Sequence, residues 1–180
     1  MWTPVTIPMS IAPYPWADPF TWTARFSYRL TDNSLDLKVK VFFKGATDKQ
    51  VTKWEKVIER IWSDKAALTD GDTVLPISLN LVSVSKAKKA DHKVKVIQRD
   101  GYGTGIDKWF AKHLDNKTVA HEFGHMIGAP DEYEWGATIQ VREGTLMAGA
   151  DTRTKIIMPD YFDVLASAVG ASWSPVDLEL

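Results

Sequence analysis

The sequence predicts an α+β fold in which helices cover a mixed, twisted β-sheet. Two neighbouring segments near the N-terminus alternate apolar and polar residues, as strands with one buried face do. Two later segments repeat apolar residues every three or four positions or carry clear helix boundaries. The predicted order is strand, strand, helix, strand, strand, helix and a last helix, which is typical of an α+β domain.

Length and composition are those of one globular domain. The chain has 180 residues, 44% hydrophobic and 25% charged, so disordered, collagen-like and low-complexity classes are excluded. Lys plus Arg number 22 and Asp plus Glu number 23, a balance that argues against a nucleic-acid partner. No apolar stretch is long enough to span a membrane. No secretory signal peptide is expected, because the first residues carry no basic segment.

The first 20 residues are rich in proline. Five of the nine prolines fall in the first 19 positions: Pro4, Pro8, Pro13, Pro15 and Pro19. Proline this dense disfavours helix and favours extended chain. We therefore expect an irregular arm over residues 1–20, followed by a single domain over residues 21–180.

A hairpin and a helix are predicted next. Residues 20–30 and 35–43 alternate in polarity and flank a turn at residues 32–34. Residues 47–68 carry one apolar stripe at helical spacing, with Thr47 as N-cap and Gln50 at the reciprocal position of a capping box. Such a stripe is expected to cover the sheet rather than to face a membrane or a partner.

Two further strands are predicted at residues 75–85 and 93–98, and a last helix at 160–169. Lysines alternate with valines in the second strand, which indicates the exposed face of an edge strand. The basic residues between 86 and 99 leave a second interpretation open, attraction of an acidic partner. The glycines between 101 and 105 lack the lysine of a phosphate loop, so we expect a flexible loop there.

The chain contains few residues that bind metals. It has no Cys, which excludes disulfides and thiolate zinc sites, and only four His. Two of them, His121 and His125, lie four residues apart in a predicted helix that begins at residue 115 or 116 and ends at Gly128. Both imidazoles therefore leave the same helix face, at the spacing that two nitrogen ligands of one zinc ion need.

The residues around the two histidines complete a candidate catalytic site. Glu122 lies about 100° around the helix from His121, so its carboxylate can activate a zinc-bound water without being a ligand. Gly128 can adopt positive φ and turn the chain back, so that Asp131 supplies a third ligand. The pattern His-Glu-x-x-His-x-x-Gly-x-x-Asp leaves the fourth tetrahedral position of Zn²⁺ open, as catalysis requires. Glu132, Glu134 and Glu143 are rival third ligands, and Glu143 in that role would give a gluzincin-like peptidase.

The segment 121–131 resembles the zinc-binding signature of the metzincin metallopeptidases, in the variant with Asp as third ligand that is known from snapalysin-type enzymes. The resemblance implies a supporting Met on a tight turn beneath the metal, and Met147 within residues 144–149 matches that position. It also implies that helix 47–68 backs the sheet, that strand 93–98 is the edge that pairs with substrate, and that the helix after Pro159 closes the core. Tyr two residues after the Met, present in some members, is replaced by Gly149, which leaves Tyr133 or Tyr161 as candidate oxyanion donors.

The sequence thus predicts a zinc-dependent endopeptidase in which Glu122 activates the zinc-bound water. Its substrate would be a protein, a peptide or the peptide part of peptidoglycan, and the protein would act as a monomer. A toxin-like effector with the same chemistry stays open, secreted or delivered into another cell and paired with a delivery or immunity protein, and so does a cytoplasmic location. The alternative from another class is a binding module that a metal stabilises without catalysis.

Overall fold

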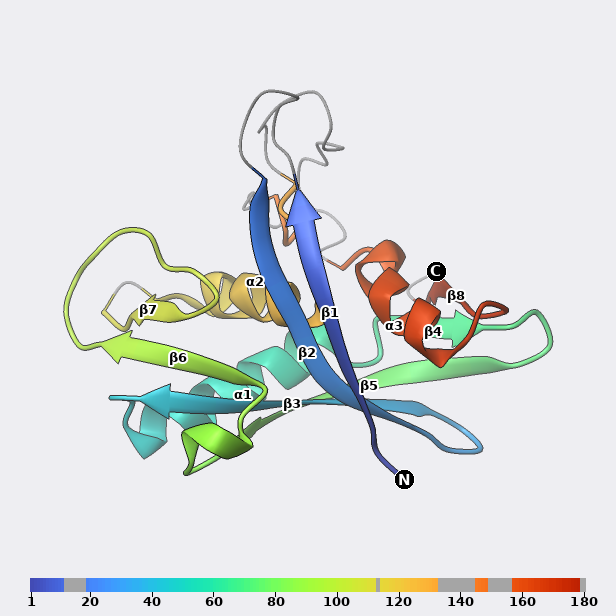
Figure 1. The fold of residues 1–180 in the computed structure, drawn as a ribbon, viewed down its shortest axis with the longest axis horizontal. Helices are drawn as coiled ribbons and strands as arrows, with labels where there is room; N and C mark the ends of the chain where they lie inside the picture. Colours follow the sequence, from blue (N-terminus) through green and yellow to red (C-terminus); the bar gives the residue numbers. More distant parts are fainter. Residues whose placement is uncertain (12–18, 113, 133–144, 149–156, 179–180) are drawn as a thin grey trace.

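The computed structural model describes residues 1–180 except residues 12–18, 113, 133–144, 149–156 and 179–180. These residues form a mixed, curled eight-stranded sheet and three α-helices, so the fold belongs to the α+β class (Figure 1). The predicted backing helix, site helix and C-terminal helix are all present. No helix of the described residues is long and apolar enough to cross a membrane.

Strand β3 (Leu35–Lys44) lies at the centre of the sheet and pairs with three other strands. Strand β5 (Val74–Ser83) runs parallel to it and occupies one edge over Leu35–Val41. Strands β2 (Phe20–Leu30) and β6 (His92–Ile97) therefore follow one another along the other edge. The antiparallel β2 pairs with the first four residues of β3, and the parallel β6 pairs with its last four. Beyond these pairings β2 and β6 diverge and form a fork.

The hairpin and its turn are confirmed, but the irregular arm is wrong over its first half. Residues Thr3–Ile11 form strand β1, which pairs antiparallel along its whole length with Phe20 to Tyr28 of β2. The prolines are tolerated because β1 is an edge strand, where a missing N–H need not break a ladder hydrogen bond. The hairpin of β1 and β2 crosses the other strands at a steep angle (Figure 1). Residues 12–18 of the predicted arm lie outside the described residues.

Strand β6 is not an edge strand, contrary to the expectation for residues 93–98. Strand β7 (Lys108–Phe110) pairs parallel with it, from Lys95 to Ile97. At the far side of the sheet, β4 (Ala66–Thr69) pairs with β5, and β8 (Ser174–Asp177) pairs with β4. Strands β4, β7 and β8 have three or four residues each, which is too short to show a period of two in the sequence.

Helix α1 (Asp48–Trp62) begins with the predicted capping box: Thr47 Oγ1 accepts from Gln50 N at 3.3 Å, and Gln50 Oε1 accepts from Thr47 N at 2.9 Å. It ends six residues earlier than predicted. Ser63 turns out of the helix because its hydroxyl donates to Leu79 O at 3.1 Å and accepts from Leu79 N at 2.9 Å, which fastens it to β5.

Helix α2 (Asn116–Ile127) begins at Asp115, whose carboxylate accepts from Thr118 N at 2.7 Å, as predicted. Trp62 fixes α2 against the core: its indole donates to Ala120 O at 3.0 Å, and its ring contacts Phe123 on α2. The same ring contacts the 3-10 helix η2 (Pro159–Phe162), which leads into α3 (Asp163–Val169). A second 3-10 helix, η1 (Ala87–Lys89), precedes β6.

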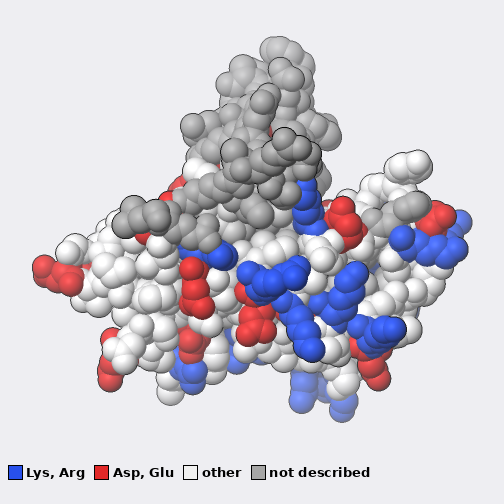
Figure 2. Space-filling view, turned by 180° about the vertical axis from the view of Figure 1, so that it is seen from behind, with Lys and Arg blue, Asp and Glu red and all other residues white. Residues whose placement is uncertain are grey.

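The face of the molecule seen from behind carries both signs of charge. Lys and Arg side chains gather toward the lower centre and right of this view, with Asp and Glu side chains scattered among and beside them (Figure 2). This distribution is in keeping with the near equality of acidic and basic residues in the sequence.

Candidate metal centre

One face of helix α2 and the loop after it bring three side chains together. His121 and His125 stand with their ring centroids 4.8 Å apart and their planes perpendicular. Asp131 Oδ1 lies 3.1 Å from Nε2 of His121 and 3.2 Å from Nε2 of His125. One candidate ligand atom from each residue falls within 4.8 Å of the others. Among the described residues this is the group of His, Asp and Glu side chains that could hold a metal ion.

Gly128 delivers Asp131 to this position. It is the C-cap of α2 and has φ of 107°, a left-handed conformation that residues with a Cβ rarely adopt. The N–H of Ala129 then bonds to Gly124 O at 2.9 Å, which turns the chain back along the helix. A Cβ at Gly128 would also lie 2.6 Å from the Val164 side chain, so α3 packs directly on the turn.

The two imidazoles are oriented by carbonyl groups on their far side. His121 Nδ1 lies 3.1 Å from Leu146 O, and His125 Nδ1 lies 2.9 Å from Ala129 O. Because a carbonyl oxygen only accepts, each Nδ1 is assigned the proton, and each Nε2 directs a lone pair toward Asp131. Asp131 Oδ1 is itself buried without a hydrogen-bond partner. Three lone-pair donors thus converge on one point, an arrangement typical of metal ligands held by outer hydrogen bonds.

The electrostatics of the cluster favour a positive charge at this point. Burial alone would lower the pKa of His121, but the Asp131 carboxylate and the Leu146 carbonyl outweigh it and raise that pKa. Burial alone would raise the pKa of Asp131, but the two histidines outweigh it and hold that pKa well below its usual range. Either a proton or a metal cation supplies the charge that these three side chains favour.

Glu122 stands beside the cluster without belonging to it. Its side chain is buried, and its Oε2 atom has no hydrogen-bond partner. Burial raises the pKa of this carboxyl, the neighbouring His125 and His121 side chains oppose the shift, and the carboxylates of Asp131 and Asp107 add to it. A buried carboxylate with an unused oxygen is suited to exchange protons with a group that enters the site.

Met147 lies beneath the helix that carries the histidines. It is fully buried, and a Cβ placed on Gly124 would lie 2.5 Å from its Sδ atom. The preceding residue, Leu146, supplies the carbonyl that orients His121. The turn at residues 145–148 therefore supports the cluster from below through both its backbone and the Met147 side chain.

Glu132, a rival ligand in the sequence, points away from the cluster into a hydrogen-bond network. Its side chain is 4% exposed, and Oε2 accepts from Thr145 Oγ1 and from the Tyr161 hydroxyl, both at 2.5 Å. Its N–H bonds to Met147 O at 3.0 Å. Burial and the Glu132 carboxylate raise the pKa of Tyr161, so the phenol stays protonated. Tyr161 thus donates to Glu132 in this structure, and its role as an oxyanion donor stays a prediction.

Trp22 is a site residue that the sequence reasoning missed. Its indole N–H donates to His125 O at 2.9 Å, and its ring meets the His125 imidazole edge-on at 5.8 Å. The alternation of residues 20–30 placed Trp22 on the buried face of a strand, but gave no sign that α2 lay against it. The other sequence candidates, Tyr133, Glu134 and Glu143, lie outside the described residues, so Glu143 as third ligand stays a prediction.

Fold and site together define an α+β protein with a His–His–Asp cluster that could hold a metal ion. No protein-family model and no curated protein match this chain. Among solved structures it is similar to the structure of myroilysin, with 17% sequence identity and a TM-score of 0.35. The match covers 53% of this chain and 49% of that chain, so this chain spans about half the length of the protein it matches.

Proposed function

We propose that this protein is a zinc-dependent metallopeptidase that hydrolyses peptide bonds. One observation carries the proposal: the lone pairs of His121, His125 and Asp131 converge beside the buried carboxylate of Glu122, on the same helix. Ligands and a proton acceptor side by side are what metal-assisted hydrolysis requires.

The donor set supports zinc. Two imidazole nitrogens and one carboxylate oxygen are ligands that zinc accepts, and three protein ligands leave its fourth position open. The carbonyl groups of Leu146 and Ala129 behind the two rings hold the imidazoles in the tautomer that binds metal. His121, His125 and Asp131 would hold the zinc, which would lower the pKa of a water molecule and polarise the carbonyl of the scissile bond.

Glu122 moves the protons in this proposal. Its Oε2 accepts a proton from the attacking water and then donates that proton to the nitrogen of the leaving amine. Burial supports this role, because it raises the carboxyl pKa toward the range in which the group takes up and releases a proton readily. Trp22 packs against His125 and helps to hold that imidazole in place.

The same observation favours an enzyme over a binding module that a metal only stabilises. A structural site needs its three ligands but has no use for a second carboxylate beside Asp131, and a buried oxygen without a partner is costly to keep. Glu122 has no hydrogen-bond role at Oε2 that would explain its presence.

The test combines metal analysis with cleavage of a random peptide library. Wild-type protein is expected to bind one zinc and to cleave, whereas Glu122→Gln should keep the zinc and lose activity by a factor of roughly 100 or more. Glu59→Gln, the same change at an exposed position of α1, is the matched control and should behave as wild type. Protein that does not bind zinc, or cleavage that survives Glu122→Gln, contradicts the proposal. Zinc binding without any cleavage supports the binding module.

A further inference from the structure

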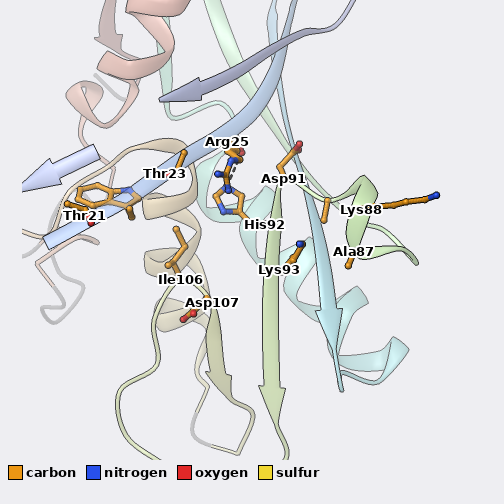
Figure 3. A pocket seen from close by; sticks show the side chains of 12 residues that line it. Thr21, Thr23, Arg25, Ala87, Lys88, Asp91, His92, Lys93, Ile106 and Asp107 are labelled. Carbon is orange, nitrogen blue, oxygen red and sulfur yellow. Dashed lines mark hydrogen bonds between the residues drawn. The ribbon is translucent and has the colours of Figure 1, made fainter. Parts of the chain in front are cut away.

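The fork between β2 and β6 encloses an open cavity of about 600 Å³ that the proposed chemistry does not use (Figure 3). Its walls are β2, the segment 87–93 that leads into β6, and residues 106–107 before β7. At the fork itself, His92 Nε2 lies 3.0 Å from Arg25 O and joins the two strands. The volume lies within the range of about 300–1,000 Å³ that is usual for ligand sites.

The β2 side of the cavity is a strand edge with unpaired backbone groups. Residues 20–26 of β2 pair with β1 on one edge, and no described strand pairs with them on the other. The carbonyl of Arg25 points toward His92, away from β1. In an antiparallel ladder the N–H and C=O of a residue point to the same edge and alternate every second residue. Thr23 and Thr21 therefore also present their N–H and C=O groups to the cavity.

The opposite wall is also free of a neighbouring strand. β7 covers β6 only from Lys95 onward, so no described strand lies beside His92 and Lys93, the residues of β6 that line the cavity, on this edge. Bare backbone donors and acceptors in a groove are the usual means by which a protein binds an extended peptide, through strand addition.

The two ends of the cavity differ in charge. Arg25 and Lys93 line it and form no ion pair with any described residue, whereas Lys88 extends away from it (Figure 3). Asp91 brings one carboxylate to the same end, where it accepts from Lys40 N at 2.8 Å. Asp107 lies toward the other end, where its charge acts on Glu122. Two cations against one carboxylate leave the fork end of the cavity net basic, which suits acidic side chains.

The cavity lies next to the proposed active site. Trp22 lines its wall, donates to His125 O at 2.9 Å and packs on the His125 ring. A peptide that lies along β2 would therefore extend from the Trp22–His125 contact toward Arg25. Thr21, Thr23 and Arg25 share the exposed face of β2, so every second side chain of the peptide would lie on their side.

We infer that the fork binds an extended acidic peptide by strand addition to β2, with acidic side chains at every second position next to Arg25 and Lys93. As the arm of a substrate, this peptide rests on the proposed function, because its other end would lie at Trp22, which contacts the candidate ligand His125.

Binding is tested without catalysis, by fluorescence anisotropy of a labelled seven-residue peptide that alternates Glu and Val. The zinc-loaded wild type is expected to bind it at least about tenfold more tightly than the matching Lys–Val peptide. Arg25→Glu should remove most of that preference. Arg60→Glu, the same change at an exposed position of α1 outside the cavity, should keep it.

Strand addition is tested on the wild type with N-methylated peptides, so that no variant needs to fold. Methyl groups on alternate amides block only one edge of an extended peptide. One of the two alternate sets should weaken binding about tenfold, and the other should have little effect. Equal effects of both sets, or a preference that Arg25→Glu leaves intact, would overturn the inference.

The two proposals fail in different ways. If the protein binds the acidic peptide but cleaves no library peptide, the peptidase proposal is wrong and the fork remains a peptide-binding site. If it cleaves without preference for acidic residues on one side of the scissile bond and does not bind the acidic peptide, the peptidase proposal holds and the inference about the fork is wrong.

Discussion

The Tyr161 hydroxyl donates to Glu132 Oε2 at 2.5 Å and so joins helix η2 to the residue that follows the candidate ligand Asp131. Thr145 donates to the same oxygen from the turn that carries Met147. The buried Glu132 carboxylate therefore connects three segments around the cluster of His121, His125 and Asp131. Its position controls that of Asp131, because the two residues are neighbours in the chain.

Removing this donor should weaken metal binding as well as the fold. Tyr161→Phe leaves the buried Glu132 carboxylate with one side-chain donor fewer, which should lower the free energy of unfolding by about 1–3 kcal/mol. Because Asp131 loses part of its support, the zinc Kd should rise roughly tenfold or more. Competition with a fluorescent chelator measures the Kd, and urea unfolding measures the stability.

Tyr28→Phe is the control for this prediction, since the Tyr28 hydroxyl donates to Ala168 O at 3.0 Å, outside the network of Glu132. It should lower stability by about 1 kcal/mol and leave the zinc Kd unchanged. Equal zinc affinities for Tyr161→Phe and wild type would show that Glu132 does not position Asp131.

Gly128 should tolerate alanine worse than another glycine with the same backbone. Gly71 has φ of 102° with nothing near its virtual Cβ, whereas Gly128 has φ of 107° and Val164 at 2.6 Å. Gly71→Ala should cost about 1–2 kcal/mol of unfolding free energy from backbone strain alone. Gly128→Ala should cost a further 1–3 kcal/mol or so, because its methyl group displaces Val164. Urea unfolding of both variants gives the difference, and equal losses would mean that α3 moves aside without strain.

Zinc should stabilise the folded protein through the three candidate ligands. At free zinc of about 1,000 times the Kd, binding adds about 4 kcal/mol, which corresponds to a rise in Tm of roughly 10 °C for a domain of this size. An excess of chelator should reverse the rise. His125→Ala should abolish it, and His92→Gln, a change at a histidine outside the cluster, should retain it. A rise that persists in His125→Ala would place the zinc elsewhere.

His92 should make the protein less stable in mild acid. Burial lowers the pKa of its imidazole below 6.5, although the carbonyl of Arg25 opposes the shift. The unfolded chain therefore takes up a proton near pH 6.5 that the folded chain takes up only at lower pH. Stability should fall as the pH drops through 6.5 and level off below the folded pKa. Comparison of urea unfolding from pH 8 to pH 5 for wild type and His92→Gln isolates this contribution. An NMR titration of His92 that gives a pKa above 6.5 would contradict the prediction.

The sequence was sufficient where the information is local. Alternation and a polar turn defined the hairpin of β2 and β3, and the Asp115 cap and Gly128 set the ends of α2 within one residue. Strand β1 was missed because its prolines argued against a strand. An edge strand tolerates proline, but the sequence does not show which strand lies at an edge. The end of α1 at Trp62 was missed because Ser63 is held by β5, a contact that no local pattern contains.

In the candidate site, too, the sequence predicts the local part and not the long-range contacts. His121, Glu122, His125 and Asp131 lie within eleven consecutive residues, so their spacing alone predicts one helix face and one return of the chain. Trp22 lies 103 residues before His125, and Tyr161 lies 29 residues after Glu132. Neither contact follows from spacing, because only the packing of β2 and η2 against α2 brings these residues together.

The position of these residues along the chain predicts that two parts of the site form at different stages of folding. The ligand set needs only one helix and one glycine turn, so closing it costs little chain entropy. The wall at Trp22 requires β2 to reach α2 across most of the sheet, a contact of high sequence separation that forms late in folding. We therefore expect the three candidate ligands to come together early in folding, and the wall that would receive a peptide to form late.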